Sequence, residues 1–312
     1  MKWVTYDAGA GPRAGILDGS TVRGLPAGVT LLSLLGDDRL AEAGESARRA
    51  PAEVRPLAEV RLLAPIPQPP SIRDALCFLD HIRGCYRAMG RSAELDPVWF
   101  QTPAFYFANP AAVLGPHEDV PIAPGCGMFD FELEIGAVIG RGGRDLHPDQ
   151  AERHIVGYTF YNDWTARDHQ LRDMAQGIGM GKAKDSAITL GPALVTVDEL
   201  EPYRQEGRLH LDLSATVNGI EIARGSLADM DWTFAELLAY LSRGTELRPG
   251  DVIGSGTIPG GCLLEHVDTP DMATFPGWLR PGDTVRLDGT GLGETNQTVR
   301  PAPAMFPLRT GY

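Results

Sequence analysis

The sequence predicts a mainly β protein of the α+β class, closer to a β-roll or barrel than to a doubly wound parallel sheet. Two observations favour this class. Short stretches rich in β-branched and aromatic residues recur along the chain, for example IVGYTFYN at 155–162. The 312 residues also include 37 glycines and 25 prolines, which suit many short elements joined by tight turns better than a helical bundle.

Residues 1–65 are expected to form a small N-terminal α/β domain. Asp18-Gly19 is a turn signal between two short apolar stretches. The proline-rich run at 64–71 can sustain neither a helix nor a central strand, so it is read as a linker to a second domain, 66–312. The elements expected in the first domain are strands at 3–6, 14–17 and 21–23 and helices at 31–35 and 38–49.

The second domain is expected to be dominated by strands. The run FDFELEIGAVI alternates apolar and acidic residues and then becomes continuously apolar, as a strand that enters the core does. Asn218-Gly219 is a strong hairpin signal. Residues 72–90 look partly helical. The strands expected are 129–139, 155–162, 190–197, 209–217, 252–253 and 284–287, and the helices are 147–154 and 234–241.

Composition and charge exclude several classes of function. The formal net charge of −13 repels phosphate backbones and anionic lipid, so we expect neither a nucleic-acid partner nor membrane docking. The four cysteines form no C-x-x-C pair, which argues against a zinc ribbon or a thioredoxin-type site. No apolar run approaches the roughly 20 residues of a membrane span, and the first residues do not resemble a signal peptide. We therefore expect a soluble, cytoplasmic protein.

The most informative feature is a pair of acidic residues on the predicted strand 129–139. Glu132 and Glu134 are two residues apart, so their side chains point to the same face of a strand. A solvated strand face is the simplest interpretation of the pair alone. However, the flanks are strongly apolar, and a second acidic segment that contains Asp163 and Asp168 ends the next predicted strand. Clustered carboxylates either raise one another's pKa or bind a cation, and all-oxygen ligation selects Mg²⁺, Ca²⁺ or Mn²⁺.

From about residue 66 to 300 the sequence resembles the fumarylacetoacetate hydrolase family. Five co-linear motifs carry the resemblance: RDALCFLDH, FDFELEIGAVIG, GYTFYNDWTARDHQ, GKAKDSAITLGP and GDVIGSGTIPGGCLLE. The resemblance implies a fumarylacetoacetase-like mixed β-roll or β-sandwich fold, and a homodimer. It also implies a divalent metal, Mg²⁺ or else Ca²⁺ or Mn²⁺. The four metal ligands that it implies are carboxylates, at Asp74, Glu132, Glu134 and Asp163.

The resemblance also implies the catalytic and substrate-binding residues. A His–Glu dyad that activates water matches His81 and Glu265. An active-site lysine matches Lys184, although Lys182 stands two residues away. The implied substrate-binding residues are Arg167, Gln170, Tyr106, Gly256 and Thr257. One departure is that Leu76 stands where the family has a tyrosine, which makes that wall of the pocket more apolar and puts fumarylacetoacetate itself in doubt as the substrate. Leu76, Phe78, Trp99, Phe105 and Met180 are candidates for pocket walls, and ordinary core packing explains each of them as well.

These residues predict an enzyme that acts on a small dicarbonyl or 2-oxo acid. The first hypothesis is a metal-dependent hydrolase that cleaves a C–C bond in a 1,3-dicarbonyl or acylpyruvate through a metal-held enolate. The alternatives on the same site are an oxaloacetate-type decarboxylase and a 2-oxo acid or enol isomerase. A non-catalytic, metal-stabilised ligand-binding protein is a further alternative. The presence of both dyad residues favours hydrolysis, because decarboxylation needs no attacking water.

Overall fold

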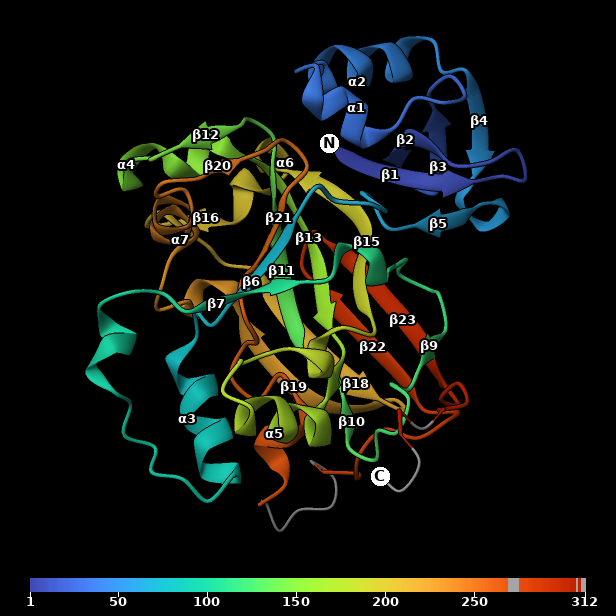
Figure 1. Cartoon of the computed structure of the whole chain (residues 1–312). Coiled ribbons are helices and arrows are strands. Elements are labelled where there is room, and N and C mark those ends of the chain that lie inside the picture. Colours follow the sequence, from blue (N-terminus) through green and yellow to red (C-terminus); the bar gives the residue numbers. More distant parts are fainter. Residues whose placement is uncertain (269–274, 307, 310–312) are drawn as a thin grey trace.

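The computed structural model describes residues 1–268, 275–306 and 308–309, and its fold is the mainly β, α+β fold predicted from the sequence (Figure 1). A twelve-stranded sheet forms its centre, in the order β4-β3-β2-β1-β15-β13-β11-β21-β6-β7, with β5 paired to β1 and β8 paired to β15. The bounds of these strands are β1 Lys2–Asp7, β2 Arg13–Asp18, β3 Thr21–Gly24, β4 Glu53–Pro56, β5 Arg61–Leu63, β6 Ile72–Ala75, β7 Phe105–Ala108, β8 Val113–Leu114, β11 Leu133–Ile139, β13 Ile155–Asp163, β15 Ile188–Thr196 and β21 Val252–Gly254.

A second sheet of five strands, β19-β18-β22-β23-β9, packs on the first. Gly289 of this sheet lies so close to Phe160 of β13 that an added Cβ would stand 2.7 Å from the phenyl ring, so the sheets meet without a gap there. Leu213 and Leu287 complete this part of the core and are fully buried. The strands are β9 Val120–Pro121, β18 Asp212–Val217, β19 Ile220–Ser226, β22 Thr284–Gly289 and β23 Gly293–Arg300, and the short pairs are β10 Phe129–Asp130 with β14 Thr165–Ala166, β12 Gly143–Arg144 with β20 Glu246–Leu247, and β16 Arg204–Gln205 with β17 Arg208–Leu209.

The helices are short and lie around the outside of the sheets (Figure 1). α7 begins as the sequence predicts, because Thr233 and Glu236 form a reciprocal capping box. No described helix has the length and apolar composition needed to cross a membrane. The helices are α1 Leu31–Gly36, α2 Leu40–Arg49, α3 Leu79–Ala88, α4 Pro148–Ala151, α5 Arg167–Ala175, α6 Val197–Leu200 and α7 Phe234–Leu241, and one 3-10 turn, η8 Leu263–His266, matters for the site.

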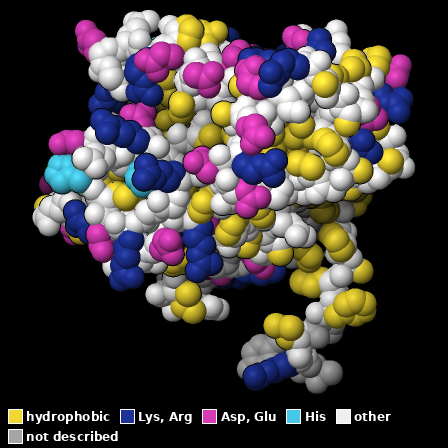
Figure 2. Space-filling view, turned by 90° about the horizontal axis from the view of Figure 1, so that it is seen from above, with side chains coloured by type: hydrophobic (Ala, Val, Ile, Leu, Met, Phe, Trp, Pro, Cys, Tyr) yellow, Lys and Arg dark blue, Asp and Glu magenta, His cyan; other side chains and the backbone are white. Residues whose placement is uncertain are grey.

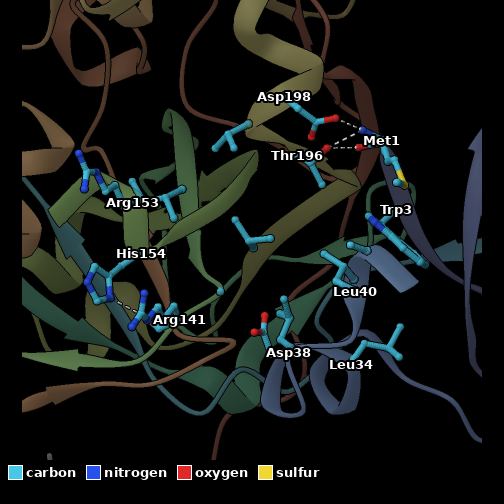
Figure 3. Close-up of a pocket in the computed structure, with 16 residues that line it drawn as sticks. Met1, Trp3, Leu34, Asp38, Leu40, Arg141, Arg153, His154, Thr196 and Asp198 are labelled. Carbon is cyan, nitrogen blue, oxygen red and sulfur yellow. Dashed lines mark hydrogen bonds and ion pairs between the residues drawn. The ribbon is translucent and has the colours of Figure 1, made fainter. Parts of the chain in front are cut away.

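The N-terminal strands continue the central sheet rather than forming a separate one. β1 pairs with β15 through Trp3 and Leu194, and β2, β3 and β4 follow outward. A cavity of about 570 Å³ lies at this junction, lined from the N-terminal side by residues such as Trp3 and from the body by residues such as His154 (Figure 3). None of the predicted site residues is among the described residues that line it. We propose that residues 1–65 and 66–312 are nevertheless two domains, joined by this strand pairing.

The body differs from the sequence prediction in several places. The expected strand 129–139 is divided, because residues 129–130 pair with β14 whereas β11 pairs with β13 and β21. Residues 131–132 therefore lie at a change of partner, and Glu132 is not part of β11. The expected strand 209–217 is divided in the same way between β17 and β18. α5 was not predicted, since its sequence RDHQLRDMA shows no apolar stripe.

On the face shown in Figure 2, acidic and basic side chains are interspersed, and Lys and Arg do not gather into one broad area. This face therefore does not have the electrostatic pattern of a nucleic-acid-binding surface.

Candidate metal and catalytic site

Three carboxylates meet on neighbouring strands of the central sheet. Asp74 lies on β6, Glu134 on β11 and Asp163 at the end of β13. One oxygen of each carboxylate lies within 4.8 Å of the others. All three side chains are buried, with at most 1% of their surface exposed. This carboxylate cluster is therefore built by the sheet order β13-β11-β21-β6.

A glycine on β21 makes the cluster possible. Gly254 pairs with Asp74 of β6 on one side and with Gly136 of β11 on the other. A Cβ at Gly254 would stand 2.1 Å from Asp74 Oδ1 and 3.2 Å from Glu134 Oε2. Because Gly254 has no side chain, the two carboxylates can approach each other in the space beside it.

Glu132, the fourth predicted ligand, is buried beside the cluster and faces two cations. Its carboxylate accepts hydrogen bonds from Lys184 Nζ and, at 2.7 Å, from Arg167 Nη2. Lys184 also lies 2.7 Å from Asp163 Oδ2. Lys182, by contrast, is exposed and pairs with Asp185. Of the two lysines that the sequence offered, Lys184 is the one among the carboxylates.

Burial and charge set the protonation of this group. Burial raises the pKa of Glu134 and Asp74 above the usual range, and the proximity of these two carboxylates raises that of Glu134 further. Burial likewise raises the pKa of Asp163 to about 7, although Lys184 opposes the shift. Burial would raise the pKa of Glu132 as well, but Lys184 and Arg167 outweigh it and hold that pKa at about 2. Raised pKa values mean that Glu134, Asp74 and Asp163 tend to keep their protons unless a further positive charge stabilises their ionised forms, as a bound dication would.

Polar groups from two further segments fix the carboxylates. The Tyr106 hydroxyl donates to Asp163 Oδ2 and, at 3.1 Å, to Asp74 Oδ2. The Gly256 N–H and the Thr257 hydroxyl each donate to Glu134 at 3.1 Å. Tyr106, Gly256 and Thr257, which the resemblance implies to bind substrate, thus contact the carboxylates themselves.

The residues of the cluster fit a hard dication. Asp163 Oδ1 is buried and accepts no hydrogen bond from the described part of the chain. An unpartnered buried carboxylate oxygen is costly unless a cation binds it. The donors are all oxygens, which Mg²⁺, Ca²⁺ and Mn²⁺ prefer. Asp74, Glu134 and Asp163 would hold such an ion, with Glu132 beside them.

The predicted dyad forms a second group on α3 and η8. His81 Nδ1 lies 2.6 Å from Glu265 Oε1, and both side chains are buried. Gly84, one turn along α3, gives Glu265 room, because a Cβ there would stand 2.4 Å from Glu265 Oε2. The Gly260 N–H donates to Glu265 Oε1 at 3.0 Å and fixes the carboxylate. The Glu265 carboxylate at Nδ1 orients the ring and leaves Nε2 as the nitrogen that can accept a proton.

The dyad shifts the titration of its histidine. Burial alone would lower the pKa of His81, but the negative charge of Glu265 outweighs burial and raises that pKa well above 6.5. The pKa of this ring therefore lies above that of an ordinary histidine.

Asp130, which the sequence analysis missed, connects the two groups. This fully buried carboxylate accepts 2.8 Å hydrogen bonds from Arg167 Nε and from the Leu263 N–H, and a 3.0 Å bond from the Leu264 N–H. Arg167 reaches Glu132 with its other end. The start of the turn that carries Glu265 is thus tied through Asp130 and Arg167 to the carboxylate cluster. The signal was available, since Asp130 is the first acid of the alternating run DFELE.

A cavity of about 430 Å³ opens beside these groups. Its polar lining is Arg167 and Gln170, whose side chains meet at 3.2 Å. The rest of the lining is apolar: Ala88, Met89, Met128, Leu171, Leu264, Val267 and Trp278. Of the hydrophobic residues suggested for the pocket walls, none lines this cavity among the described residues, and Phe78 is a buried core residue.

Comparison with known proteins identifies the relatives of this chain. A family model described as fumarylacetoacetate hydrolase, C-terminal, matches residues 71–300, and one described as Rv2993c-like, N-terminal, matches residues 1–65. A Burkholderia ambifaria protein named "Putative hydrolase" is 33% identical over 309 residues, 97% of this chain and 100% of that protein. The human mitochondrial oxaloacetate tautomerase is 31% identical over 252 residues, 79% of this chain and 73% of that protein. Fumarylacetoacetate hydrolase from psychrophilic Exiguobacterium antarcticum superposes with a TM-score of 0.74 at 26% identity, covering 97% of this chain and 100% of that one.

Replacing Gly254 by alanine should weaken divalent-metal binding. The new Cβ would occupy the space of the Asp74 and Glu134 oxygens and push them apart. We expect a loss of about 10- to 100-fold in Mn²⁺ affinity, as for other changes that misplace metal ligands. Isothermal titration with Mn²⁺ measures it. Gly136→Ala is the matched control, because the atoms nearest to its Cβ would belong to Val252, Thr159 and Tyr161 and not to the carboxylates. Equal affinities of the two variants would contradict the role of Gly254.

Replacing Asp130 by asparagine should destabilise the fold. The change removes the charge opposite Arg167 and turns amide hydrogens toward backbone donors. We expect a loss of roughly 3 kcal/mol in the free energy of unfolding, measured by urea titration. Asp119→Asn breaks an exposed pair with Arg300 and serves as the control, with an expected loss under about 1 kcal/mol. Similar losses of unfolding free energy in both variants would show that Asp130 stabilises the fold no more than an exposed ion pair does.

Proposed function

The chain belongs to the fumarylacetoacetate hydrolase family, and on that premise we propose that it is a divalent-metal-dependent hydrolase that cleaves a C–C bond in a 1,3-dicarbonyl or acylpyruvate-type substrate. The observation that carries this proposal is the His81–Glu265 pair at 2.6 Å, tied through Asp130 and Arg167 to a buried carboxylate cluster. A metal cluster alone would serve several reactions, whereas a positioned His–Glu pair supplies the base that hydrolysis needs.

The metal that we propose is Mg²⁺, with Ca²⁺ or Mn²⁺ as alternatives, and Asp74, Glu132, Glu134 and Asp163 as its ligands. The oxygen donors and the unpartnered Asp163 Oδ1 support this choice. When bound, a dication polarises the carbonyl oxygens of a dicarbonyl and stabilises the negative charge that develops on them. Lys184 supplies a further positive charge on the same side, from within 2.7 Å of Asp163.

The cavity beside the site supports a substrate with one polar and one apolar end. Arg167 and Gln170 can hydrogen-bond a carboxylate or keto oxygen. The rest of the lining, which includes Met89, Leu264 and Trp278, offers no charged group. An acylpyruvate with an aliphatic or aromatic acyl group matches this lining, and its acyl carbon chain would lie against the apolar residues.

In the proposed mechanism His81 moves one proton, and Glu265 and Lys184 stabilise the charges that develop. His81 takes a proton from water at Nε2, while Glu265 at Nδ1 stabilises the resulting imidazolium. The hydroxide forms a bond to the carbonyl carbon, and the Lys184 ammonium stabilises the oxyanion. The C–C bond then breaks, its electron pair stays with the leaving carbon, and the His81 imidazolium returns the proton to that carbon. Arg167 keeps the carboxylate end in place.

Tautomerisation of an oxaloacetate-like 2-oxo acid is the second candidate function. The 31% identity with the human mitochondrial oxaloacetate tautomerase over 79% of this chain favours it. Such a reaction would use the same carboxylate cluster and would need His81 only to move a proton between carbon and oxygen.

From family membership we also propose that the protein is a cytoplasmic homodimer.

The first test is turnover with defined variants. With acylpyruvates and Mg²⁺, Asp163→Ala and Glu132→Ala should abolish both turnover and Mn²⁺ binding. His81→Ala should lower kcat by about 10²- to 10⁴-fold and leave Mn²⁺ affinity unchanged, because it removes the base and not a ligand. Lys184→Ala should lower kcat, and Lys182→Ala, on the exposed lysine, is its matched control.

Product analysis separates the two functions. Hydrolysis gives pyruvate and a carboxylic acid, whereas tautomerisation changes the enol absorbance of oxaloacetate without breaking a C–C bond. Full turnover after removal of divalent ions by a chelator would contradict the proposed metal dependence. Wild-type kcat in His81→Ala would contradict the proposed base.

The pH dependence of kcat/KM tests the dyad. Only neutral His81 can accept a proton, and Glu265 raises its pKa, so kcat/KM should rise with pH through a pKa above 6.5. Glu265→Gln removes the negative charge, so burial then lowers the histidine pKa and the rise should move to lower pH, with a smaller plateau. Glu265→Asp keeps the negative charge, so kcat/KM should rise at the same pH as in the wild type. A rise that stays at the same pH in Glu265→Gln would mean that another group titrates.

A further inference from the structure

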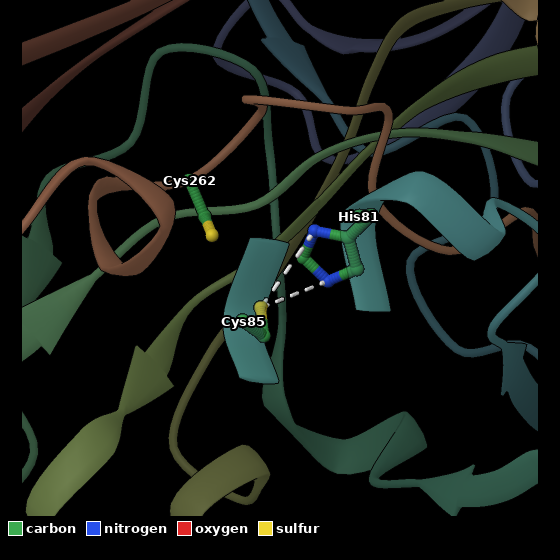
Figure 4. Close-up of side chains that lie close together, drawn as sticks. All are labelled: His81, Cys85 and Cys262. Carbon is green, nitrogen blue, oxygen red and sulfur yellow. Dashed lines mark hydrogen bonds between the residues drawn. The ribbon is translucent and has the colours of Figure 1, made fainter. Parts of the chain in front are cut away.

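Two thiols stand beside the imidazole of the dyad (Figure 4). Cys85 lies one turn after His81 on α3, so both side chains are on the same face of the helix. Cys262 immediately precedes η8 and comes from the opposite side, with its sulfur turned toward the same space. All three side chains are buried. We refer to His81, Cys85 and Cys262 as the thiol–imidazole cluster.

The spacing of this cluster matches tetrahedral coordination of one ion. Cys85 Sγ lies 3.6 Å from His81 Nε2. In a tetrahedral zinc site, with bonds of about 2.3 Å to sulfur and 2.0 Å to nitrogen, the two donors stand about 3.5 Å apart. The ligand atoms of all three residues lie within 4.8 Å of one another, and two sulfurs on one zinc stand about 3.8 Å apart. Side-chain shifts of about 1 Å or less would therefore complete three coordination positions.

The second ligand shell of a zinc site is also in place. Histidines that bind zinc usually donate their other ring N–H to a carboxylate. His81 Nδ1 has such a partner in Glu265, at 2.6 Å, and Nε2 is the nitrogen nearer to Cys85. The donor set of one imidazole and two sulfurs is soft, unlike the all-oxygen carboxylate cluster, and it favours Zn²⁺ over Mg²⁺.

We propose that His81, Cys85 and Cys262 form a second metal site, distinct from the carboxylate cluster, that takes one Zn²⁺ ion. Both thiols lose their protons to solvent as the ion binds, so the site carries two thiolates and one neutral imidazole. The ion reaches it from the apolar cavity, because Cys85 and Cys262 pack with Leu264, Met89 and Trp278, which line that cavity.

Zinc in this site inhibits the enzyme. The ion takes the lone pair of Nε2, and His81 can then no longer accept a proton from water. This consequence rests on the proposed function, whereas the site itself does not.

Titration of the full-length, metal-stripped protein with Co²⁺ tests the site directly. Cobalt bound by two thiolates gives an intense near-ultraviolet charge-transfer band, and cobalt bound by carboxylates alone does not. The wild type should show this band at one ion per chain, and Zn²⁺ should displace it. Cys85→Ser and Cys262→Ser should each lose most of it. Cys126→Ser, which removes a thiol outside the cluster, should keep it, and so should Asp163→Asn in the carboxylate cluster.

Thiol protection provides a measurement that needs no variant. Under native conditions Zn²⁺ should slow alkylation of Cys85 and Cys262, mapped by peptide mass spectrometry, and leave Cys126 unchanged. Absence of the cobalt band in the wild type, its persistence in Cys85→Ser, or equal alkylation with and without Zn²⁺ would overturn the site.

The effect on turnover is measured separately. Preincubation with one equivalent of Zn²⁺ should lower the kcat of the wild type and of Cys126→Ser at least tenfold, with Mg²⁺ in excess. Cys85→Ser should resist at the same zinc concentration. A wild type that binds cobalt through thiolates and is not inhibited would uphold the site and contradict the role of His81 as the base.

Discussion

The structure depends on keeping several carboxylates together out of water. Asp74, Glu134 and Asp163 approach within 4.8 Å, and Glu132 and Asp130 are buried beside them. The buried side chains of Lys184 and Arg167 neutralise part of this charge. Like charges at such distances in a region of low dielectric cost several kcal/mol, so the cluster persists where cations neutralise it or where some of its carboxyl groups keep their protons. Local features follow from this constraint: the glycine at 254, the hydroxyl of Tyr106, and the hydrogen bonds to Glu134.

Arg167 connects the carboxylate cluster to the His81–Glu265 pair. Its guanidinium joins Asp130 to Glu132, and Asp130 in turn binds two backbone N–H groups at the start of η8. The position of the turn that carries Glu265 is therefore coupled to the charge of the carboxylate cluster through these hydrogen bonds. The fold could have held the two groups by apolar packing alone. Charged hydrogen bonds hold the two groups together instead, which suits the proposed mechanism, in which a base and a carbonyl must be positioned together.

The sequence predicted what local pattern and motif order can predict. The strand 155–162, helix 234–241 and the hairpin at Asn218-Gly219 follow from periodicity and turn chemistry, and all three are present. The division of strand 129–139 could not be foreseen, because it results from pairing with β14 on one side and with β13 and β21 on the other. The contact of Glu265 with His81 spans 184 positions in the chain. Only the family resemblance related these two residues before the structure did. Asp130 was missed for another reason: the sequence shows it as the first acid of the run DFELE, but not that its side chain binds Arg167 and two backbone N–H groups.

The two metal sites that we propose differ in their ligand chemistry, and this difference would direct different ions to them. The carboxylate cluster offers only oxygens and little flexibility, since hydrogen bonds hold Asp74 and Glu134 in place. The thiol–imidazole cluster offers sulfur and nitrogen, and its thiols are held only by weak contacts such as that of Cys262 with Glu265 at 3.7 Å. First-row affinities favour Zn²⁺ over Mn²⁺ at most sites, so a low zinc concentration would fill the softer cluster first, while abundant Mg²⁺ fills the oxygen cluster. Because two thiols flank His81, the base that we propose would be open to inhibition by zinc.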